Sequence, residues 1–202
     1  VNVPAGDLMQ GGNGIAGIPG QEVAFAQAVE LAIEYASALK VSSVNILAGK
    51  QPEDADLLPC LTTLAENLKF AAIRLSDNNI QPVFEMINGI DMPRFLIQNI
   101  AQAQEMLEVV NHPFLKMQFD CYHMAMMNEN ILEALHENIQ DIGHIQFADC
   151  PHRHQPDTGN INYADIFDYL NQSNYKGFVA AEYKPQPSSE TSFDWKDKYF
   201  SI

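Results

Sequence analysis

The stretch that decides the fold is LKMQFDCYH at residues 115–123, an apolar run that carries a carboxylate, Asp120, near its end. Four other short runs are built in the same way: residues 44–49 (VNILAG), 82–88 (PVFEMIN), 143–150 (GHIQFADC) and 177–185 (GFVAAEYKP). Each run is too short for a buried helix, and most are rich in Val, Ile or Phe, which predicts strands. Residues 1–4 match the end of a further strand.

Amphipathic stretches separate these runs. In residues 22–40, apolar side chains recur at i, i+4 and i+7, while Gln27 and Glu30 lie elsewhere on the predicted helix. The same spacing marks residues 56–78, 100–110, 130–138 and 163–172. Strands that alternate with helices predict repeated βαβ units, and near-continuous apolar strands predict a parallel sheet covered on both faces.

Such a sheet either stays open or closes into a (β/α)₈ barrel. Neither a G-x-G-x-x-G motif nor a G-x-x-x-x-G-K-[ST] motif follows any predicted strand, which disfavours an open nucleotide-binding sheet.

Composition narrows the range of partners. The 202 residues include 11 Lys and Arg against 26 Asp and Glu, a formal net charge of −15, which would repel nucleic acid. The apolar runs are too short to span a membrane, and three widely spaced cysteines suit free thiols better than a disulfide framework. These features predict a cytoplasmic globular protein with neither nucleic acid nor membrane as a partner.

Polar side chains occupy the carboxyl ends of four predicted strands. They are Glu85, Asp120, Gln146 and Glu182. Parallel α/β folds place their chemistry at this edge, and a carboxylate in an apolar strand costs several kcal/mol unless it is compensated. Because Lys and Arg are scarce on these strands, four oxygen ligands favour Mg²⁺ or Mn²⁺, and an all-oxygen set disfavours zinc.

A second polar cluster, DCPHRHQPDTG at residues 149–159, follows the strand that carries Gln146. It is the densest cationic segment of an acidic chain, and His152 and Arg153 suit an anionic or polyhydroxylated substrate. His123 comes three residues after Asp120, and Lys184 comes two after Glu182. We expect both side chains to contact the substrate as well.

Taken together, these motifs resemble the hydroxypyruvate isomerase family of xylose-isomerase-like TIM barrels, which also contains 2-oxo-tetronate isomerases. The resembling stretches run through the chain in order: NVPAGD (2–7), GIPG (17–20), FEMIN (84–88), QFDCYHM (118–124), HIQFAD (144–149), PHR (151–153), TGNINY (158–163) and EYKPQ (182–186).

This resemblance implies a TIM (β/α)₈ barrel that lacks its N-terminal βα units, with residues 1–202 forming a single domain from about strand three to strand eight. It implies Glu85 and Glu182 as the paired catalytic glutamates. It implies Glu85, Asp120, Gln146 and Glu182 as the metal site, although the wider superfamily often has His where this chain has Gln146. The implied reaction interconverts hydroxypyruvate and tartronate semialdehyde, so the expected partner is a small hydroxy-keto acid.

Several alternatives stay open at this point. The chain could be a 2-oxo-tetronate isomerase, a sugar epimerase or a non-catalytic remnant, whereas an AP-endonuclease-like phosphodiesterase is disfavoured by the charge and by too few His ligands. A barrel without its first units would expose two sheet edges. Either the chain is a fragment of a longer protein or it forms a homo-oligomer that hides those edges.

Overall fold

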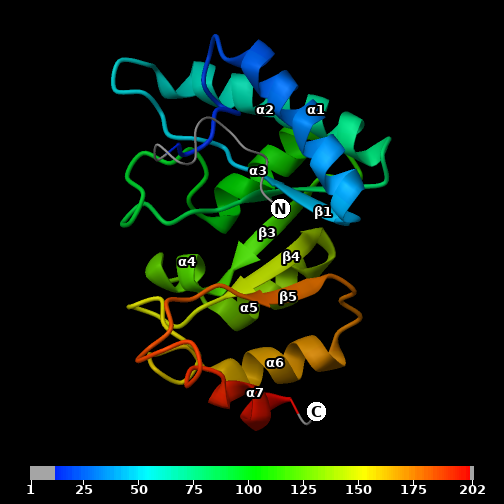
Figure 1. The fold of residues 1–202 in the computed structure, drawn as a ribbon. Helices are drawn as coiled ribbons and strands as arrows, with labels where there is room; N and C mark the ends of the chain where they lie inside the picture. The colour runs from blue at the N-terminus through cyan, green and yellow to red at the C-terminus, as the bar shows by residue number, and fades with distance from the viewer. Residues whose placement is uncertain (1–11, 201–202) are drawn as a thin grey trace. The chain divides into compact units, whose positions relative to one another are not determined.

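The computed structural model describes residues 12–200, which form two compact units divided between Gln118 and Phe119 (Figure 1). Five strands follow one another in a sheet of order β1-β2-β3-β4-β5, which is also their order along the chain. The predicted strand end at residues 1–4 lies outside the described residues. Among the described residues, no helix is both long and apolar enough to cross a membrane.

The observed elements confirm the predicted alternation, because each of the five apolar runs overlaps a strand and each amphipathic stretch overlaps a helix. In the first unit they are α1 (Glu22–Leu39), β1 (Ser43–Ile46), α2 (Leu57–Ser76), β2 (Gln81–Glu85), α3 (Ile100–Val110) and β3 (Lys116–Asp120), whose last two residues belong to the second unit. In the second they are α4 (Cys121–Met126), α5 (Ile131–Asn138), the 3₁₀ turn Ile139–Asp141, β4 (Ile142–Phe147), α6 (Tyr163–Gln172), β5 (Phe178–Ala181) and α7 (Asp194–Tyr199).

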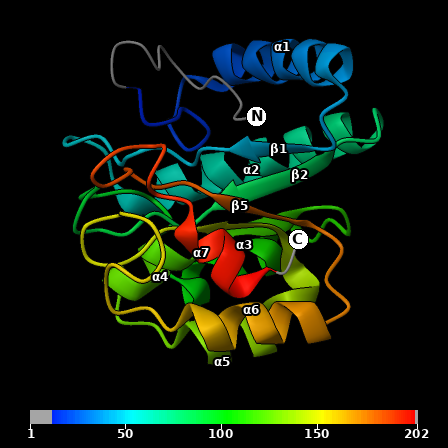
Figure 2. The same cartoon turned by 60° about the horizontal axis from the view of Figure 1, so that its bottom comes forward.

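The first unit packs its helices against a parallel sheet. β1 pairs with β2, and β2 pairs with β3 in a register that sets Glu85 opposite Gln118. α1 and α2 lie side by side in Figures 1 and 2, and an exposed ion pair of 2.7 Å joins Glu30 of α1 to Arg74 of α2. The apolar stripe of α2 is buried from Leu64 to Leu75, and burial of apolar surface of this kind favours folding.

A glycine fixes the loop before α1 against β1. Gly14 has φ +100°, and a Cβ added there would lie 2.5 Å from the Leu47 carbonyl oxygen. We therefore expect Gly14→Ala to lower the free energy of unfolding by at least about 2 kcal/mol, because it adds a backbone clash to an unfavourable dihedral angle. Gly20→Ala is the control, since Gly20 has φ +86° with nothing within 4 Å of the new Cβ. Denaturant unfolding of both variants measures the difference, and equal losses would contradict the clash.

The second unit is held by an aromatic cluster beneath its two paired strands. β4 and β5 are parallel, with Gln146 opposite Ala180. α7, which sequence reasoning did not predict, lies against α6 in Figures 1 and 2. The ring of Phe167 on α6 lies 5.2 Å from that of Tyr199, and Phe147 on β4 lies 5.2 Å from Trp195. Such aromatic pairs add to the stabilisation that burial provides.

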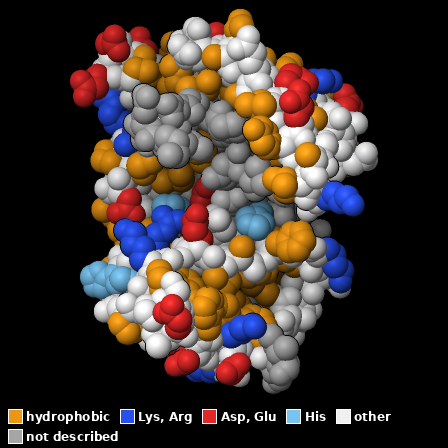
Figure 3. Space-filling model, in the orientation of Figure 1, with side chains coloured by type: hydrophobic (Ala, Val, Ile, Leu, Met, Phe, Trp, Pro, Cys, Tyr) orange, Lys and Arg blue, Asp and Glu red, His pale blue; other side chains and the backbone are white. Residues whose placement is uncertain are grey.

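β5 differs from the expectation that both faces of every strand are covered. Its side chains are largely exposed, with Phe178 at 68% and Val179 at 37%. Hydrophobic side chains gather on the surface of the second unit over β5 and α6 (Figure 3). The expectation of cover was wrong for this strand, because the apolar sequence of a strand reports how it is covered in a complete barrel. The apolar sequence does not show which helices or strands pack on that strand in a given chain.

β3 is also shorter than predicted. The run at residues 115–123 was expected to be one strand, but the strand ends at Asp120 and Cys121 begins α4. Asp120 is the N-cap of this helix, and its side chain accepts a hydrogen bond of 2.9 Å from the Tyr122 backbone N–H. The prediction was wrong here because an N-cap aspartate inside an apolar run gives no break in periodicity.

Candidate active site

Two carboxylates in the second unit come from the ends of different strands. Asp120 is the last residue of β3, and its side chain is fully buried. Glu182 directly follows β5, and its side chain is 52% exposed. The Glu182 backbone N–H donates to the Phe147 carbonyl oxygen of β4, which extends the strand pairing by one residue and fixes where the side chain leaves the backbone.

Arg153 joins the two carboxylates. Its Nη2 atom lies 3.1 Å from Asp120 Oδ2 and 2.5 Å from Glu182 Oε2. The guanidinium also lies over the ring of Tyr122, with Cζ 4.9 Å from the ring centroid, in a cation–π contact. Two negatively charged groups therefore converge on a single positive group within this unit.

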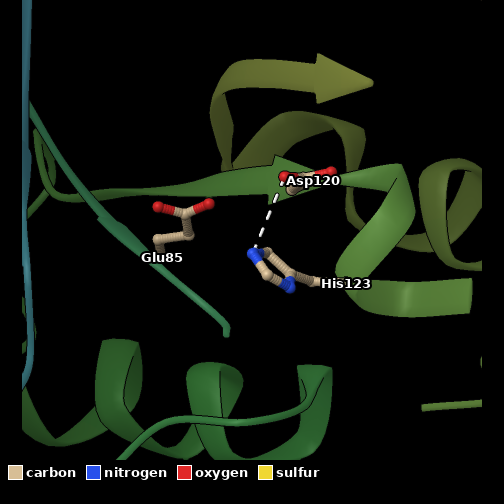
Figure 4. Close-up of side chains that lie close together, drawn as sticks. All are labelled: Glu85, Asp120 and His123. Atoms are coloured by element: carbon tan, nitrogen blue, oxygen red, sulfur yellow. Dashed lines mark ion pairs between the residues drawn. The ribbon is translucent and has the colours of Figure 1, made fainter. Parts of the chain in front are cut away.

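His123 completes this group. It lies on the first turn of α4 and is buried, and its Nε2 atom is 3.8 Å from Asp120 Oδ2, the contact marked by the dashed line in Figure 4. The same nitrogen is 3.3 Å from Arg153 Nη1. Because the guanidinium only donates, a hydrogen bond there requires the neutral ring with Nε2 as the acceptor.

Burial dominates the electrostatics of Asp120. It raises the pKa of this carboxyl to about 6, outweighing the Arg153 charge and the Tyr122 backbone N–H, both of which lower the pKa. A carboxylate in this position requires positive charge beside it in order to remain ionised near neutral pH. In this structure Arg153 supplies that charge.

The polar loop at residues 149–159 lies beside these residues in the same unit. Arg153 is half-buried within it, whereas His152 is exposed, with its ring 5.9 Å from that of His154. Lys184 is exposed beyond the end of β5, and its backbone carbonyl oxygen lies 2.7 Å from His154 Nδ1. Its backbone N–H donates to the Arg153 carbonyl oxygen at 2.7 Å.

Gln146 lies on β4 as predicted, one residue before the end of the strand, and it is partly exposed. Its neighbour in register is Ala180 of β5, and Glu182 comes two residues after Ala180. The amide therefore belongs to the strand pair whose carboxyl end presents Glu182. Its role as a ligand stays a prediction.

Glu85 belongs to the first unit, where it ends β2 and is 5% exposed. Its Oε2 atom accepts a hydrogen bond of 2.8 Å from Asn45 Nδ2 on β1. Asn45 Oδ1 is buried without a hydrogen-bond partner among the described residues. A buried oxygen that lacks a partner and lies beside a carboxylate can bind a hard cation, or it can accept a hydrogen bond from an ordered water molecule.

Sequence reasoning missed three residues that hold predicted site residues or their loop, one in the first unit and two in the second. Tyr122 lies beneath Arg153, Asn45 holds Glu85, and Asp149 binds four backbone N–H groups of the polar loop. Asn45 and Tyr122 lie inside apolar runs, where nothing in the periodicity marks them. Asp149 did carry a signal, because an aspartate at the start of a loop rich in Pro, Asp and Gly often accepts local backbone hydrogen bonds.

The structure has parallel strands that alternate with helices, and carboxylates lie at the strand ends. Both features are typical of α/β-barrel enzymes. The chain belongs to the xylose isomerase-like TIM barrel family, whose model matches residues 1–199. The five-stranded sheet described here is an incomplete form of that barrel.

Two relatives of similar sequence are isomerases by name. The chain is 41% identical to hydroxypyruvate isomerase of Escherichia coli K12, over 98% of this chain and 77% of the relative. It is 34% identical to 2-oxo-tetronate isomerase of Cupriavidus necator, over 98% and 76%. A crystal structure of a protein described as AP endonuclease, family 2, from Brucella melitensis matches with a TM-score of 0.93 at 32% identity, over 98% and 76%. The chain thus spans about three quarters of these relatives, and it is a member of an isomerase family.

Proposed function

We propose that this protein interconverts hydroxypyruvate and tartronate semialdehyde with the help of a divalent cation. The observation that carries the proposal is the convergence of Asp120 and Glu182 on one positive group at the carboxyl ends of their strands. The similarity to hydroxypyruvate isomerase of E. coli supports the choice of substrate.

The proposed cation ligands are Glu85, Asp120, Gln146 and Glu182. The oxygen donors fit Mg²⁺ or Mn²⁺, and the partnerless Asn45 Oδ1 beside Glu85 agrees with such a donor set. Strand register supports including Glu85, because it pairs with Gln118, and β3 runs on from Gln118 to Asp120. Glu85, Asp120 and His123, the residues labelled in Figure 4, also have the side-chain types of a metal-ligand group.

The reaction itself needs two bases. When bound, the cation supplies positive charge that stabilises the enediolate formed from the substrate. One glutamate removes the proton from the substrate carbon that bears the hydroxyl group, and the other returns a proton to the neighbouring carbon. We assign these roles to Glu85 and Glu182. Glu85 is buried, whereas the exposure of Glu182 lets it exchange its proton with solvent.

The remaining polar residues are proposed to bind the substrate. His123 is buried beside Asp120 and suits a substrate hydroxyl or carbonyl group. Arg153 and Lys184 provide positive charge in the loops that follow β4 and β5, and His152 adds a polar ring there, which suits the carboxylate of a keto acid.

The similarity to 2-oxo-tetronate isomerase favours a second substrate of the same chemical class, a longer hydroxy-keto acid. Turnover of hydroxypyruvate and of 2-oxo-tetronate, measured side by side with Mg²⁺ and again after chelation, tests the proposal. We expect isomerisation that the chelator abolishes, with the larger kcat/KM for hydroxypyruvate. Failure to isomerise either acid would contradict the proposed function, and a larger kcat/KM for 2-oxo-tetronate would assign that substrate instead.

Cation binding also predicts a thermal shift. Mn²⁺ at about 100 times its Kd should raise Tm by about 5 °C or more, because a ligand that binds only the folded state stabilises it. The shift should saturate with Mn²⁺ concentration. A titration followed by calorimetry measures it, and no saturable shift would count against a resident cation.

A further inference from the structure

Asp149 is a buried carboxylate whose function differs from that of the carboxylates at the strand ends. It follows β4 and is 1% exposed. Each oxygen accepts two backbone hydrogen bonds, Oδ1 from Cys150 and Ile161 at 2.9 and 3.1 Å, and Oδ2 from Gly159 and Thr158 at 2.9 and 3.1 Å. One side chain therefore holds both ends of the loop between β4 and α6.

The segment held in this way carries Arg153. The Arg153 backbone N–H donates to the Asp149 carbonyl oxygen at 2.9 Å, and the Asp149 N–H donates to the His154 carbonyl oxygen at 2.8 Å. Arg153 has φ +57°, a left-handed conformation that costs a non-glycine residue free energy, so surrounding contacts must enforce it. These two backbone hydrogen bonds of Asp149 close the tight turn, and its side chain holds the backbone on either side of it.

The fit around the carboxylate is close. A Cβ added at Gly159 would lie 2.6 Å from Asp149 Oδ1 and would also clash with the Cys150 carbonyl oxygen. Only glycine at position 159 therefore lets the backbone come this close to the carboxylate.

We propose that Asp149 is a positioning residue that folds the loop at residues 149–161 so that Arg153 reaches Asp120 and Glu182. Its four acceptor bonds fix the backbone on both sides of Arg153, and the long arginine side chain then contacts both carboxylates from a fixed origin. An amide in place of this carboxylate has only one acceptor atom, so Asp149→Asn must leave two of the four N–H groups facing a donor.

Limited trypsin digestion of the folded full chain tests the loop directly. We expect D149N and G159A to be cleaved after Arg153 at least about tenfold faster than wild type, because cleavage follows local opening of the backbone. Asn138→Ala is the matched control. It removes another buried polar side chain of this unit, one that hydrogen-bonds the Ala134 carbonyl oxygen on α5. If N138A were cleaved after Arg153 as fast as D149N, or if D149N and G159A were cleaved as slowly as wild type, the proposal would be overturned.

A double-mutant cycle then tests whether Asp149 acts through Arg153, and this second arm rests on the proposed function. For hydroxypyruvate we expect D149N and R153A each to raise KM about tenfold or more, and the double variant to match R153A, because the two residues serve one contact. N138A should leave KM unchanged. If the double variant raised KM by the product of the two single effects, the proposal would be overturned. If wild type isomerises neither keto acid, the proposed function fails, and the trypsin result alone decides whether Asp149 orders the loop.

Discussion

Glu182→Gln is expected to lower kcat by about 10³-fold or more, because an amide cannot accept the proton that the reaction moves. The side chain keeps its size, and an amide oxygen can still accept a hydrogen bond from Arg153 Nη2. The fold should survive, since Glu182 is 52% exposed and its N–H pairing to Phe147 involves only the backbone. Initial rates of hydroxypyruvate isomerisation, together with Tm, measure the effect.

Glu190→Gln is the matched control for this variant. Glu190 is exposed in the segment between β5 and α7, and a side-chain hydrogen bond from Ser188 lowers the pKa of its carboxyl. This variant removes the same charge from the same part of the chain and should keep wild-type activity. Activity of E182Q within about tenfold of wild type would refute the assignment of Glu182 as a base.

Asp120→Asn is the second variant for which a large effect is expected. We expect Mn²⁺ binding to weaken by about 100-fold and turnover to fall by a similar factor or more, because the buried carboxylate becomes a neutral amide. The helix cap should be kept, because asparagine is as good an N-cap residue as aspartate and its Oδ1 atom can accept from the Tyr122 N–H. Calorimetric titration with Mn²⁺ measures the affinity.

The control for D120N is Asp168→Asn, a substitution of the same kind at an exposed position of α6. D168N should bind Mn²⁺ as wild type does. An unchanged Mn²⁺ affinity in D120N, with a fold intact by circular dichroism, would remove Asp120 from the cation site.

Much of the fold followed from local patterns. The apolar run at residues 82–88 predicted β2 because it is short and nearly continuous, and the stripe of residues 56–78 predicted α2 because its helical spacing is visible in the sequence. The end of β3 was misplaced because it depends on a single hydrogen bond, which the Tyr122 backbone N–H donates to the Asp120 side chain. The assignment of residues 1–202 to one domain stays a prediction, as does a homo-oligomer.

The candidate site was predictable in its ingredients and less so in its contacts. Asp120 and Glu182 were expected near one another because parallel strands end at one edge of a sheet. The sequence could not place Arg153 between them, since that contact depends on the folded loop and on a positive φ. This single arginine serves both carboxylates, so Glu182 must share it or be released from it when it accepts a proton. The metal and substrate roles of the individual residues stay predictions.

β5 is an edge strand with an exposed apolar surface. The chain covers about three quarters of its curated relatives, and the strand with the least covered side chains, β5, is at one end of the described sheet order. An apolar edge strand of this kind favours pairing with further polypeptide.

Proton NMR of hydroxypyruvate turned over with Mg²⁺ in D₂O tests most directly whether two glutamates pass a proton across the substrate. We predict that tartronate semialdehyde acquires deuterium at C2, because the exposed Glu182 carboxyl exchanges its proton with solvent before delivering it. The label should appear at the rate of product formation and should be absent with E182Q. Product that forms at the wild-type rate and carries only protium at C2 would instead indicate a direct hydride shift and contradict the mechanism.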